Sequence, residues 1–283
     1  MNDLAITPAE RVCGSVLAAA RKAIGALDAR VLLEHAIGCA AADVMAHPER
    51  VLTLDQHARY RAAVQRRARG EPVAYIVGER EFYGRSFRVS PDVLIPRPET
   101  ELLVELALAH MPLEEKYDVL DLGTGSGCVA LTLAAERPRI RVTAVDISDP
   151  ALNVAKANAR ALSISNVCFL LSDWFAALDD VRVELIVANP PYVADADPHL
   201  AKGDVCFEPP LALCGGADGL SALRTIIAAS REHLAPGGSL YLEHGYDQAP
   251  AVRELLVADG YVDVVSYRDM AGIERVSGGR FPD

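Results

Sequence analysis

The sequence lacks the patterns that mark metal-binding, disulfide-linked and membrane-spanning proteins. Its six cysteines are scattered and none forms a C-x-x-C pair, so neither a zinc site nor a disulfide framework is indicated. The apolar run Val16–Ala20 is too short to span a membrane, and no basic segment precedes it as in a signal peptide. There is no internal repeat or low-complexity tract. We therefore expect a cytoplasmic protein that needs no metal and contacts no membrane.

Aromatic residues and positive charge are also scarce. Only 6% of the 283 residues are aromatic, and the net charge is −11, which argues against a broad nucleic-acid-binding surface. Residues 1–75 carry a net charge of +2, whereas residues 76–283 carry −13. This asymmetry suggests separate roles for the two parts, although solvated surface charge is the simpler interpretation of most of these residues.

Helix signals dominate the first part of the chain. A capping box at Thr53 and several helix-ending glycines predict a small all-helical N-terminal domain over residues 1–72, expected to recognise the substrate. Strand-like residues at Ala74–Val77 and Ser86–Val89 then predict a β-hairpin linker over residues 73–95.

From Tyr117 onward the pattern alternates between strands and helices, which indicates a mostly parallel sheet in an α/β domain over residues 96–283. The last two strand candidates are too close in sequence for a crossover helix and should pair antiparallel. The seven predicted strands are Asp118–Leu122, Val142–Ile147, Val167–Leu171, Val183–Ala188, Leu240–Glu243, Val262–Ser266 and Glu274–Val276.

A glycine-rich turn follows the first of these strands. Its spacing is G-x-G-x-G, which differs from the dinucleotide G-x-G-x-x-G, and no Lys-Ser/Thr follows as in a phosphate-binding loop. The turn therefore favours an adenosine-type ligand without phosphate. The candidate cofactor-binding residues here are Asp121, Gly123, Thr124, Gly125, Ser126 and Gly127.

The next two strands end in further candidate binding residues. Asp146 follows the second strand, where a carboxylate can accept both ribose hydroxyls of an adenosine; capping the next helix is the alternative role, which Ser148 could fill instead. Asp173 and Trp174 follow the third strand, and the ring of Trp174, the only tryptophan, could flank an adenine or could pack in the core.

The fourth strand ends in Asn189-Pro190-Pro191-Tyr192. The two prolines stop the strand and hold the chain stiffly at its carboxyl end. The side-chain oxygen of Asn189 and the Pro190 carbonyl offer two acceptors, and Tyr192 offers a flat aromatic face. This set suits a planar NH₂ group on an amide or a nucleobase, although Asn before Pro also commonly starts a turn.

The order of these motifs along one sheet edge resembles the Rossmann-like class I S-adenosylmethionine-dependent methyltransferases. Further stretches are similar to the HemK/PrmC family, the protein-(glutamine-N5) methyltransferases that modify peptide chain release factors. These are Glu81–Gly84, Leu94–Glu101, Asp173–Phe175, Phe207–Pro209, Glu243–Gly245 and Glu274–Val276.

The resemblance implies S-adenosylmethionine as the cofactor and, as the substrate, the glutamine of the Gly-Gly-Gln tripeptide in class 1 release factors. It implies that Asn189, Pro190 and Tyr192 are catalytic: Asn189 and the Pro190 carbonyl would accept the two N–H bonds of the amide, and Pro191 and Tyr192 would shape the slot. Asn189 is also a candidate cofactor-binding residue. We expect a monomer that binds release factors and no nucleic acid directly. The alternatives are an adenine-N6 nucleic-acid methyltransferase, a glutamine methyltransferase acting on a ribosomal protein, and a module that binds the cofactor without catalysis.

Overall fold

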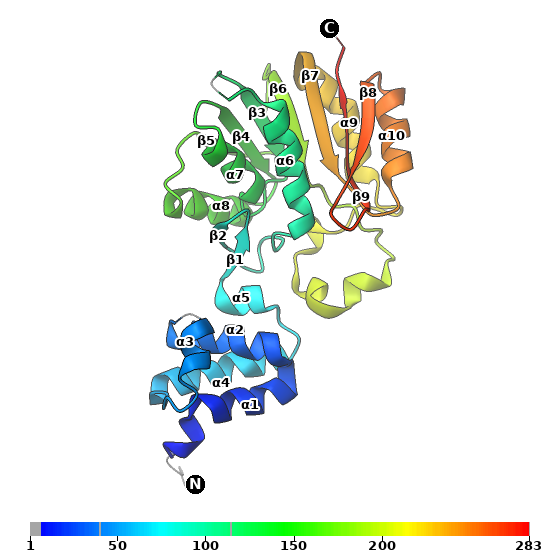
Figure 1. Ribbon diagram of the computed structural model, residues 1–283. Coiled ribbons are helices and arrows are strands. Elements are labelled where there is room, and N and C mark those ends of the chain that lie inside the picture. Colours follow the sequence, from blue (N-terminus) through cyan, green and yellow to red (C-terminus); the bar gives the residue numbers. More distant parts are fainter. Residues whose placement is uncertain (1–6, 40, 114, 283) are drawn as a thin grey trace. The chain divides into compact units, whose positions relative to one another are not determined.

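The computed structural model describes residues 7–39, 41–113 and 115–282 (Figure 1). The chain divides into two compact units, of which the first ends at Gly78 and the second begins at Glu79. No helix in the described part of the chain is long and apolar enough to cross a membrane.

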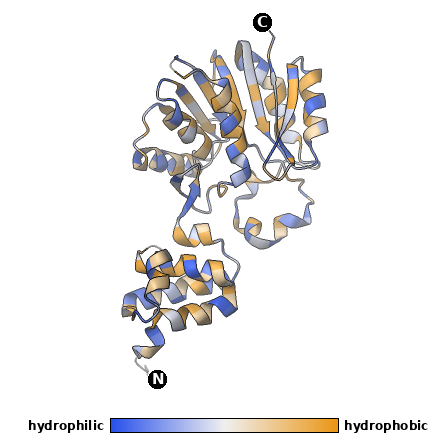
Figure 2. Ribbon diagram, viewed as in Figure 1, coloured by the Kyte–Doolittle hydropathy of each residue, from blue (hydrophilic) through white to orange (hydrophobic). Residues whose placement is uncertain are grey.

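The first unit is helical and has its own apolar core. The capping box predicted at Thr53 is confirmed: its hydroxyl accepts from the Gln56 backbone at 3.1 Å, and the Gln56 side chain accepts from the Thr53 backbone at 3.0 Å. Leu32, Leu33 and Tyr60 are fully buried, and these helices carry both hydrophobic and hydrophilic stretches (Figure 2). The helices are α1 (Cys13–Ile24), α2 (Ala26–Ile37), α3 (Ala41–Ala46), α4 (Leu54–Ala68) and α5 (Val73–Val77).

The strand predicted at Ala74–Val77 is wrong, because this segment forms α5. Pro72 stands at the N-cap, and Gly78 ends the helix in the left-handed region with φ 85°. These local start and stop signals, together with packing against α2 and α4, outweigh the β-branched composition of the segment.

The hairpin consists of β1 (Glu79–Phe82) and β2 (Arg85–Arg88) and belongs to the second unit. Phe82 and Phe87 are buried and contact edge to face, with ring centroids 6.1 Å apart. The Arg88 backbone N–H donates to Asn158 Oδ1 at 2.7 Å, and Asn158 Nδ2 donates to the Arg88 carbonyl at 3.0 Å. The hairpin is thereby fixed to the helix that carries Asn158.

A seven-stranded, mostly parallel sheet organises the second unit, as predicted (Figure 1). The strand order is β5-β4-β3-β6-β7-β9-β8, and only β9 pairs antiparallel with its two neighbours. The strands are β3 (Asp118–Leu122), β4 (Arg141–Asp146), β5 (Val167–Leu171), β6 (Val183–Ala188), β7 (Leu234–Glu243), β8 (Val262–Arg268) and β9 (Glu274–Arg280).

Helices cover both faces of this sheet. Alternate strand residues point to opposite faces: Val119 packs into the core under one set of helices, and Leu120 into the core under the other. The first set comprises α6 (Glu101–His110), α7 (Cys128–Glu136) and α8 (Asp149–Ala161). The second comprises α9 (Ser221–His233) and α10 (Ala249–Ala258).

The four adjacent parallel strands β5, β4, β3 and β6 end at one edge of the sheet. Leu122 is in register with Ala188 of β6, and Asp146 is in register with Leu171 of β5. The loops that follow these strands therefore meet, and they carry the residues that the sequence singles out.

Candidate active site

A cavity of about 380 Å³ lies at the carboxyl ends of these strands, where open α/β sheets bind ligands. Its size is within the range of roughly 300–1,000 Å³ that is typical of small-molecule pockets. Gly127, Pro190 and Tyr192 are not among the residues that line it. The predicted site residues that do line it are Asp121, Gly123, Thr124, Gly125, Ser126, Asp146, Asp173, Trp174, Asn189 and Pro191.

Hydrogen bonds fix the turn that follows β3. The Thr124 backbone N–H donates to the Val145 carbonyl at 2.9 Å, which ties the turn to β4. The Thr124 hydroxyl donates to Asp121 Oδ2 at 2.7 Å. Asp121 is buried at the end of its strand, and burial raises the pKa of its carboxyl to about 7.

The glycines of the turn have two different roles. At Gly125, with φ 55°, a Cβ would meet no heavy atom within 4 Å, so the missing side chain leaves open space at the cavity. At Gly127, with φ 81°, a Cβ would lie 3.0 Å from Leu131 Cδ1 and 3.1 Å from Ala155 Cβ. Gly125 therefore makes room for a ligand, whereas Gly127 permits close packing of α7 against α8.

Asp146 supports the turn and faces the cavity. Its Oδ2 accepts from the Gly125 backbone at 2.8 Å and its Oδ1 from the Ser148 backbone at 2.9 Å. Ser148 itself caps α8, since its hydroxyl accepts from the Ala151 backbone at 3.2 Å. Capping is thus the role of Ser148, which leaves the Asp146 carboxylate at the cavity wall for a ligand.

Trp174 adopts a left-handed backbone conformation, with φ 48°. A bulky residue rarely takes this conformation without compensating contacts. The Ser172 hydroxyl donates to the Trp174 carbonyl at 2.9 Å, and the indole ring would lie 3.5 Å from a Cβ at Gly123. Trp174 and Asp173 both line the cavity, so the ring is placed beside the glycine turn.

Asn189 lies at the cavity wall with its side-chain amide oriented. Its Nδ2 donates to the buried Thr100 hydroxyl at 3.1 Å. The side-chain oxygen Oδ1 accepts no hydrogen bond from any residue between 7 and 282 that the structure describes. It is the end of the amide that remains for a ligand.

Tyr192, at the end of the motif, is not among the residues that line the cavity. Its phenol donates to Glu243 Oε1 at 3.1 Å. Glu243 ends β7 and is buried. Burial raises the pKa of its carboxyl to about 7, although hydrogen bonds from the Thr100 and Tyr192 hydroxyls lower this pKa in part. The slot-lining role predicted for Tyr192 stays a prediction, and the contact that the structure describes is its hydrogen bond to Glu243.

The long loop after the Asn-Pro-Pro-Tyr motif is anchored by a buried ion pair. Glu208 pairs with Arg97, and its Oε2 also accepts from the Ile95 backbone at 3.2 Å. The side chain of Glu208 is fully buried, whereas that of Arg97 is about one third exposed and lines the cavity. The two residues therefore form an ion-paired scaffold that anchors the loop.

The cavity wall is acidic. Its charged lining residues are one arginine, Arg97, and four aspartates, Asp92, Asp121, Asp146 and Asp173. Burial raises the pKa of Asp146 as well as that of Asp121, partly offset at Asp146 by hydrogen bonds from backbone N–H groups. Burial opposes the ionisation of these carboxyl groups, and a cation bound in the cavity would stabilise their ionised form. Binding of a cation is therefore favoured.

Two residues of the site, Thr100 and Glu243, have no role assigned from the sequence. Both lie in family-like stretches, and Glu243 is an acid directly after the apolar run of β7. An acid at the buried end of a strand was the signal in the sequence that could have identified Glu243 as a site residue.

Within the described ranges, no group of three or more His, Cys, Asp or Glu is arranged to hold a metal ion.

Comparisons with known proteins extend these observations. A model of the PrmC N-terminal domain matches residues 11–78, and a model of the methyltransferase small domain matches residues 99–205. The chain is 53% identical over 265 residues to a release factor glutamine methyltransferase of Burkholderia pseudomallei, covering 92% of this chain and 93% of that protein. The protein of the same name from Escherichia coli is 46% identical over 254 residues, covering 90% and 91%.

A solved structure shows the same fold. The 16S rRNA N2 G1207 methyltransferase of T. thermophilus, in complex with AdoMet and guanosine, matches with a TM-score of 0.53 at 22% identity. The match covers 71% of this chain and 49% of that chain.

The sheet topology and the cavity at its carboxyl edge define a Rossmann-like class I S-adenosylmethionine-dependent methyltransferase, which confirms the predicted fold class. The two release factor glutamine methyltransferases match about nine tenths of the chain at 53% and 46% identity, which is specific to one branch of that class. The chain belongs to the release factor glutamine methyltransferase family, and the predicted resemblance is confirmed.

The cavity residues fit S-adenosylmethionine. The space at Gly125 admits a ligand close to the backbone, and the Trp174 ring offers an apolar surface beside it. Asp146 offers carboxylate acceptors at the position expected for ribose hydroxyls, and Asp121 adds negative charge for a cationic ligand. The lining therefore matches a nucleoside that carries positive charge and no phosphate.

Proposed function

We propose that this chain transfers a methyl group from S-adenosylmethionine to the side-chain amide nitrogen of the glutamine in the Gly-Gly-Gln tripeptide of class 1 peptide chain release factors. Relatives at 46% and 53% identity that carry the name release factor glutamine methyltransferase support the proposal. The observation in the site that carries it is Asn189, whose Nδ2 is held by Thr100 and whose Oδ1 remains as an acceptor at the cavity wall.

A glutamine amide needs alignment more than activation. Its nitrogen is a poor nucleophile, because the lone pair is delocalised into the carbonyl group. S-adenosylmethionine supplies an electrophilic methyl group on a sulfonium. Holding two reactants in line at near-attack distance can supply roughly 7–11 kcal/mol of the barrier at best. We therefore propose that the site works mainly by positioning.

Asn189 would do most of that positioning. Its Oδ1 would accept one N–H bond of the amide, and the Pro190 carbonyl is the second acceptor predicted from the sequence. Both acceptors would direct the nitrogen lone pair at the methyl group and stabilise the positive charge that develops on nitrogen. Tyr192, through its hydrogen bond to Glu243, would hold the turn in place.

The helical N-terminal unit, predicted as residues 1–72, would grip the rest of the release factor. The basic face of α4, formed by Arg59, Arg61, Arg66 and Arg67 with Arg69 at the C-cap, is a candidate contact, but several of these arginines are already paired within the unit. Arg59 pairs with Asp55 at 3.1 Å and Arg67 with Asp28 at 2.6 Å, and Arg66 pairs with Glu71. We therefore assign that face a smaller part in recognition. A monomer acting in the cytoplasm fits this role.

The competing substrate is the adenine amino group, which is also planar and conjugated. An enzyme acting on it must extrude the base and hold the nucleic-acid backbone with Lys and Arg. The net charge of −13 over residues 76–283 opposes such a grip.

Transfer of labelled methyl from S-adenosylmethionine tests the proposal. A bacterial class 1 release factor should become labelled, and the same factor with the Gly-Gly-Gln glutamine replaced by alanine should not. Label retained on the replaced factor, or found only on duplex DNA or on a ribosomal protein, would contradict the proposal.

A further inference from the structure

The side chain of Gln248 contacts the turn that carries Asn189. Its Nε2 donates to the Tyr192 carbonyl at 2.9 Å and to the Gly219 carbonyl at 3.3 Å. Its Oε1 accepts from the Gly245 backbone N–H at 2.8 Å. Both ends of the Gln248 amide therefore form hydrogen bonds. A 180° flip of the amide would place its oxygen against two carbonyl oxygens, so the orientation of the amide is fixed.

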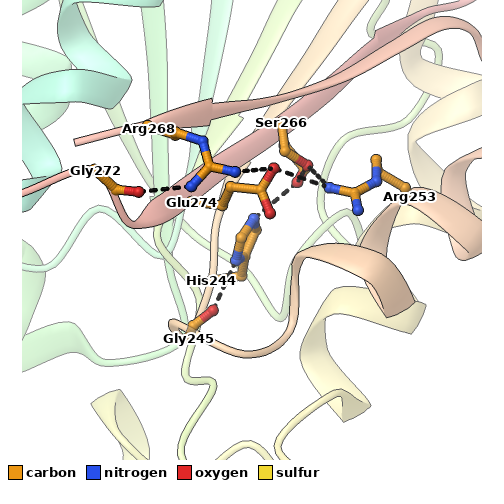
Figure 3. Close-up of polar contacts among 8 residues, drawn as sticks. His244, Gly245, Arg253, Ser266, Arg268, Gly272 and Glu274 are labelled. Atoms are coloured by element: carbon orange, nitrogen blue, oxygen red, sulfur yellow. Dashed lines mark hydrogen bonds and ion pairs between the residues drawn. The ribbon is translucent and has the colours of Figure 1, made fainter.

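Gly245 is itself held by a chain of hydrogen bonds that runs across β8 and β9 (Figure 3). Arg253 Nη1 lies 2.7 Å from Ser266 Oγ, and Ser266 Oγ lies 2.6 Å from Ser277 Oγ. Ser277 Oγ lies 2.8 Å from His244 Nε2, and His244 Nδ1 lies 2.9 Å from the Gly245 carbonyl.

The donor at each step follows from the two ends of this chain. Arg253 can only donate, and the Gly245 carbonyl can only accept, so His244 Nδ1 carries the hydrogen. In the neutral ring Nε2 must then accept from Ser277, and Ser277 must accept from Ser266. Burial lowers the pKa of His244, which keeps the ring neutral and the direction fixed. Gly245 is therefore held at its carbonyl by His244 while its N–H orients Gln248.

Two glycines also lie close against the turn. A Cβ at Gly219 would lie 2.3 Å from the Tyr192 carbonyl oxygen and 2.7 Å from Gln248 Nε2. A Cβ at Gly215 would lie 2.7 Å from the Pro191 carbonyl oxygen. The turn is therefore packed closely against the backbone at Gly215 and Gly219 and against the Gln248 amide, and its two prolines restrict its backbone further.

We propose that Gln248 is a positioning residue for methyl transfer: it holds the Tyr192 carbonyl and so keeps Asn189, three residues earlier on the same stiff turn, aligned with the substrate amide. This inference rests on the proposed function. Gln248 is not among the residues that line the cavity, and both ends of its side-chain amide are bonded within the protein, so we assign it no contact with substrate or cofactor. Its loss should therefore lower kcat and leave the binding of both substrates nearly unchanged.

The test uses Gln248→Glu in the full chain, with a class 1 release factor as the methyl acceptor. The introduced carboxylate keeps the shape of the side chain but loses both N–H donors and faces two carbonyl oxygens. At pH 8 we expect kcat to fall roughly ten- to hundredfold, with both KM values within about twofold of wild type. As pH falls, protonation restores one donor, so the ratio of variant to wild-type kcat should rise.

Two further variants complete the design. Gln248→Met removes the donors without adding charge, and its loss of kcat should not depend on pH; it carries the test if Gln248→Glu fails to fold. Glu254→Gln, an exposed change on α10, the helix that directly follows Gln248, should match wild type. The proposal is wrong if either Gln248 variant keeps wild-type kcat at pH 8, or if the loss appears in KM for S-adenosylmethionine instead. A wild-type protein that labels no release factor would contradict the proposed function itself.

Discussion

Asn189 donates its side-chain N–H to the hydroxyl of Thr100 at 3.1 Å, although the two residues are 89 positions apart in the sequence. Thr100 is buried at the start of α6, and Asn189 stands at the end of β6. The pair determines which end of the Asn189 amide faces the cavity, because a hydroxyl that accepts from Nδ2 leaves Oδ1 for the substrate.

Removing the Thr100 hydroxyl should therefore impair orientation. In Thr100→Val the side chain keeps its shape but cannot accept from Asn189, so the amide can rotate and present its NH₂ end. We expect kcat to fall by up to about tenfold, the value of one hydrogen bond at the upper end of the usual range. Thr100→Ser keeps the hydroxyl and should retain most activity. Steady-state methyl-transfer kinetics measure both, and equal activity of the two variants would refute the orientation role.

Asn189→Ala and Asp146→Ala should fail in opposite ways. Loss of the Asn189 acceptor should lower kcat by at least about a hundredfold, because it removes an interaction made in the transition state. Affinity for S-adenosylmethionine should change little. Asp146→Ala should weaken cofactor binding, measured by titration calorimetry, because Asp146 also supports Gly125. Unchanged cofactor binding in Asp146→Ala would show that the ribose role is wrong.

Two glycine substitutions should separate ligand space from packing. In Gly125→Ala the Cβ meets no heavy atom within 4 Å, so the loss of stability should be limited to the backbone strain of about 1–2 kcal/mol. The added methyl group occupies space that the cofactor needs, so cofactor binding should weaken. In Gly127→Ala the Cβ is compressed against Leu131 and Ala155, so unfolding should show a larger loss. Denaturant unfolding and calorimetry on both variants check this. A Gly125→Ala protein that binds the cofactor normally would contradict the assignment.

Cofactor binding should release a proton. Burial raises the pKa of Asp121 to about 7, so below that pH much of the free protein carries a protonated Asp121. A cation bound nearby favours the carboxylate and lowers this pKa, so affinity should rise with pH up to about 7 and then level off. Calorimetry at pH 6 in buffers of different ionisation enthalpy measures the released proton. Asp121→Asn should show a smaller release, and a wild-type protein that releases none would refute the prediction.

Much of the fold could be predicted because it depends on local pattern. Apolar runs that end in Asp146 or in Asn189-Pro190, separated by helix-length stretches, predict parallel strands whose ends meet at one edge. The exception is Ala74–Val77, where β-branched residues favoured a strand but Pro72 and Gly78 provide the ends of a short helix.

The details of the site depended on contacts that no local pattern contains. Thr100 meets Asn189, and Gln248 meets Tyr192, only because segments far apart in the sequence come together in the fold. The hydrogen bond from the Tyr192 phenol to the buried Glu243 likewise joins residues 51 positions apart in the sequence. Local sequence identifies the residues of a turn but does not determine which of them face the cavity.

The position of β9 has a consequence for how the protein is made. Glu274–Arg280 pairs with β7 on one side and β8 on the other, although both of those strands come earlier in the chain. During synthesis β7 and β8 emerge first and cannot be joined until β9 is available, so each exposes an unpaired edge for that interval. Truncation before Glu274 would make that exposure permanent, and the shortened chains should aggregate as they leave the ribosome.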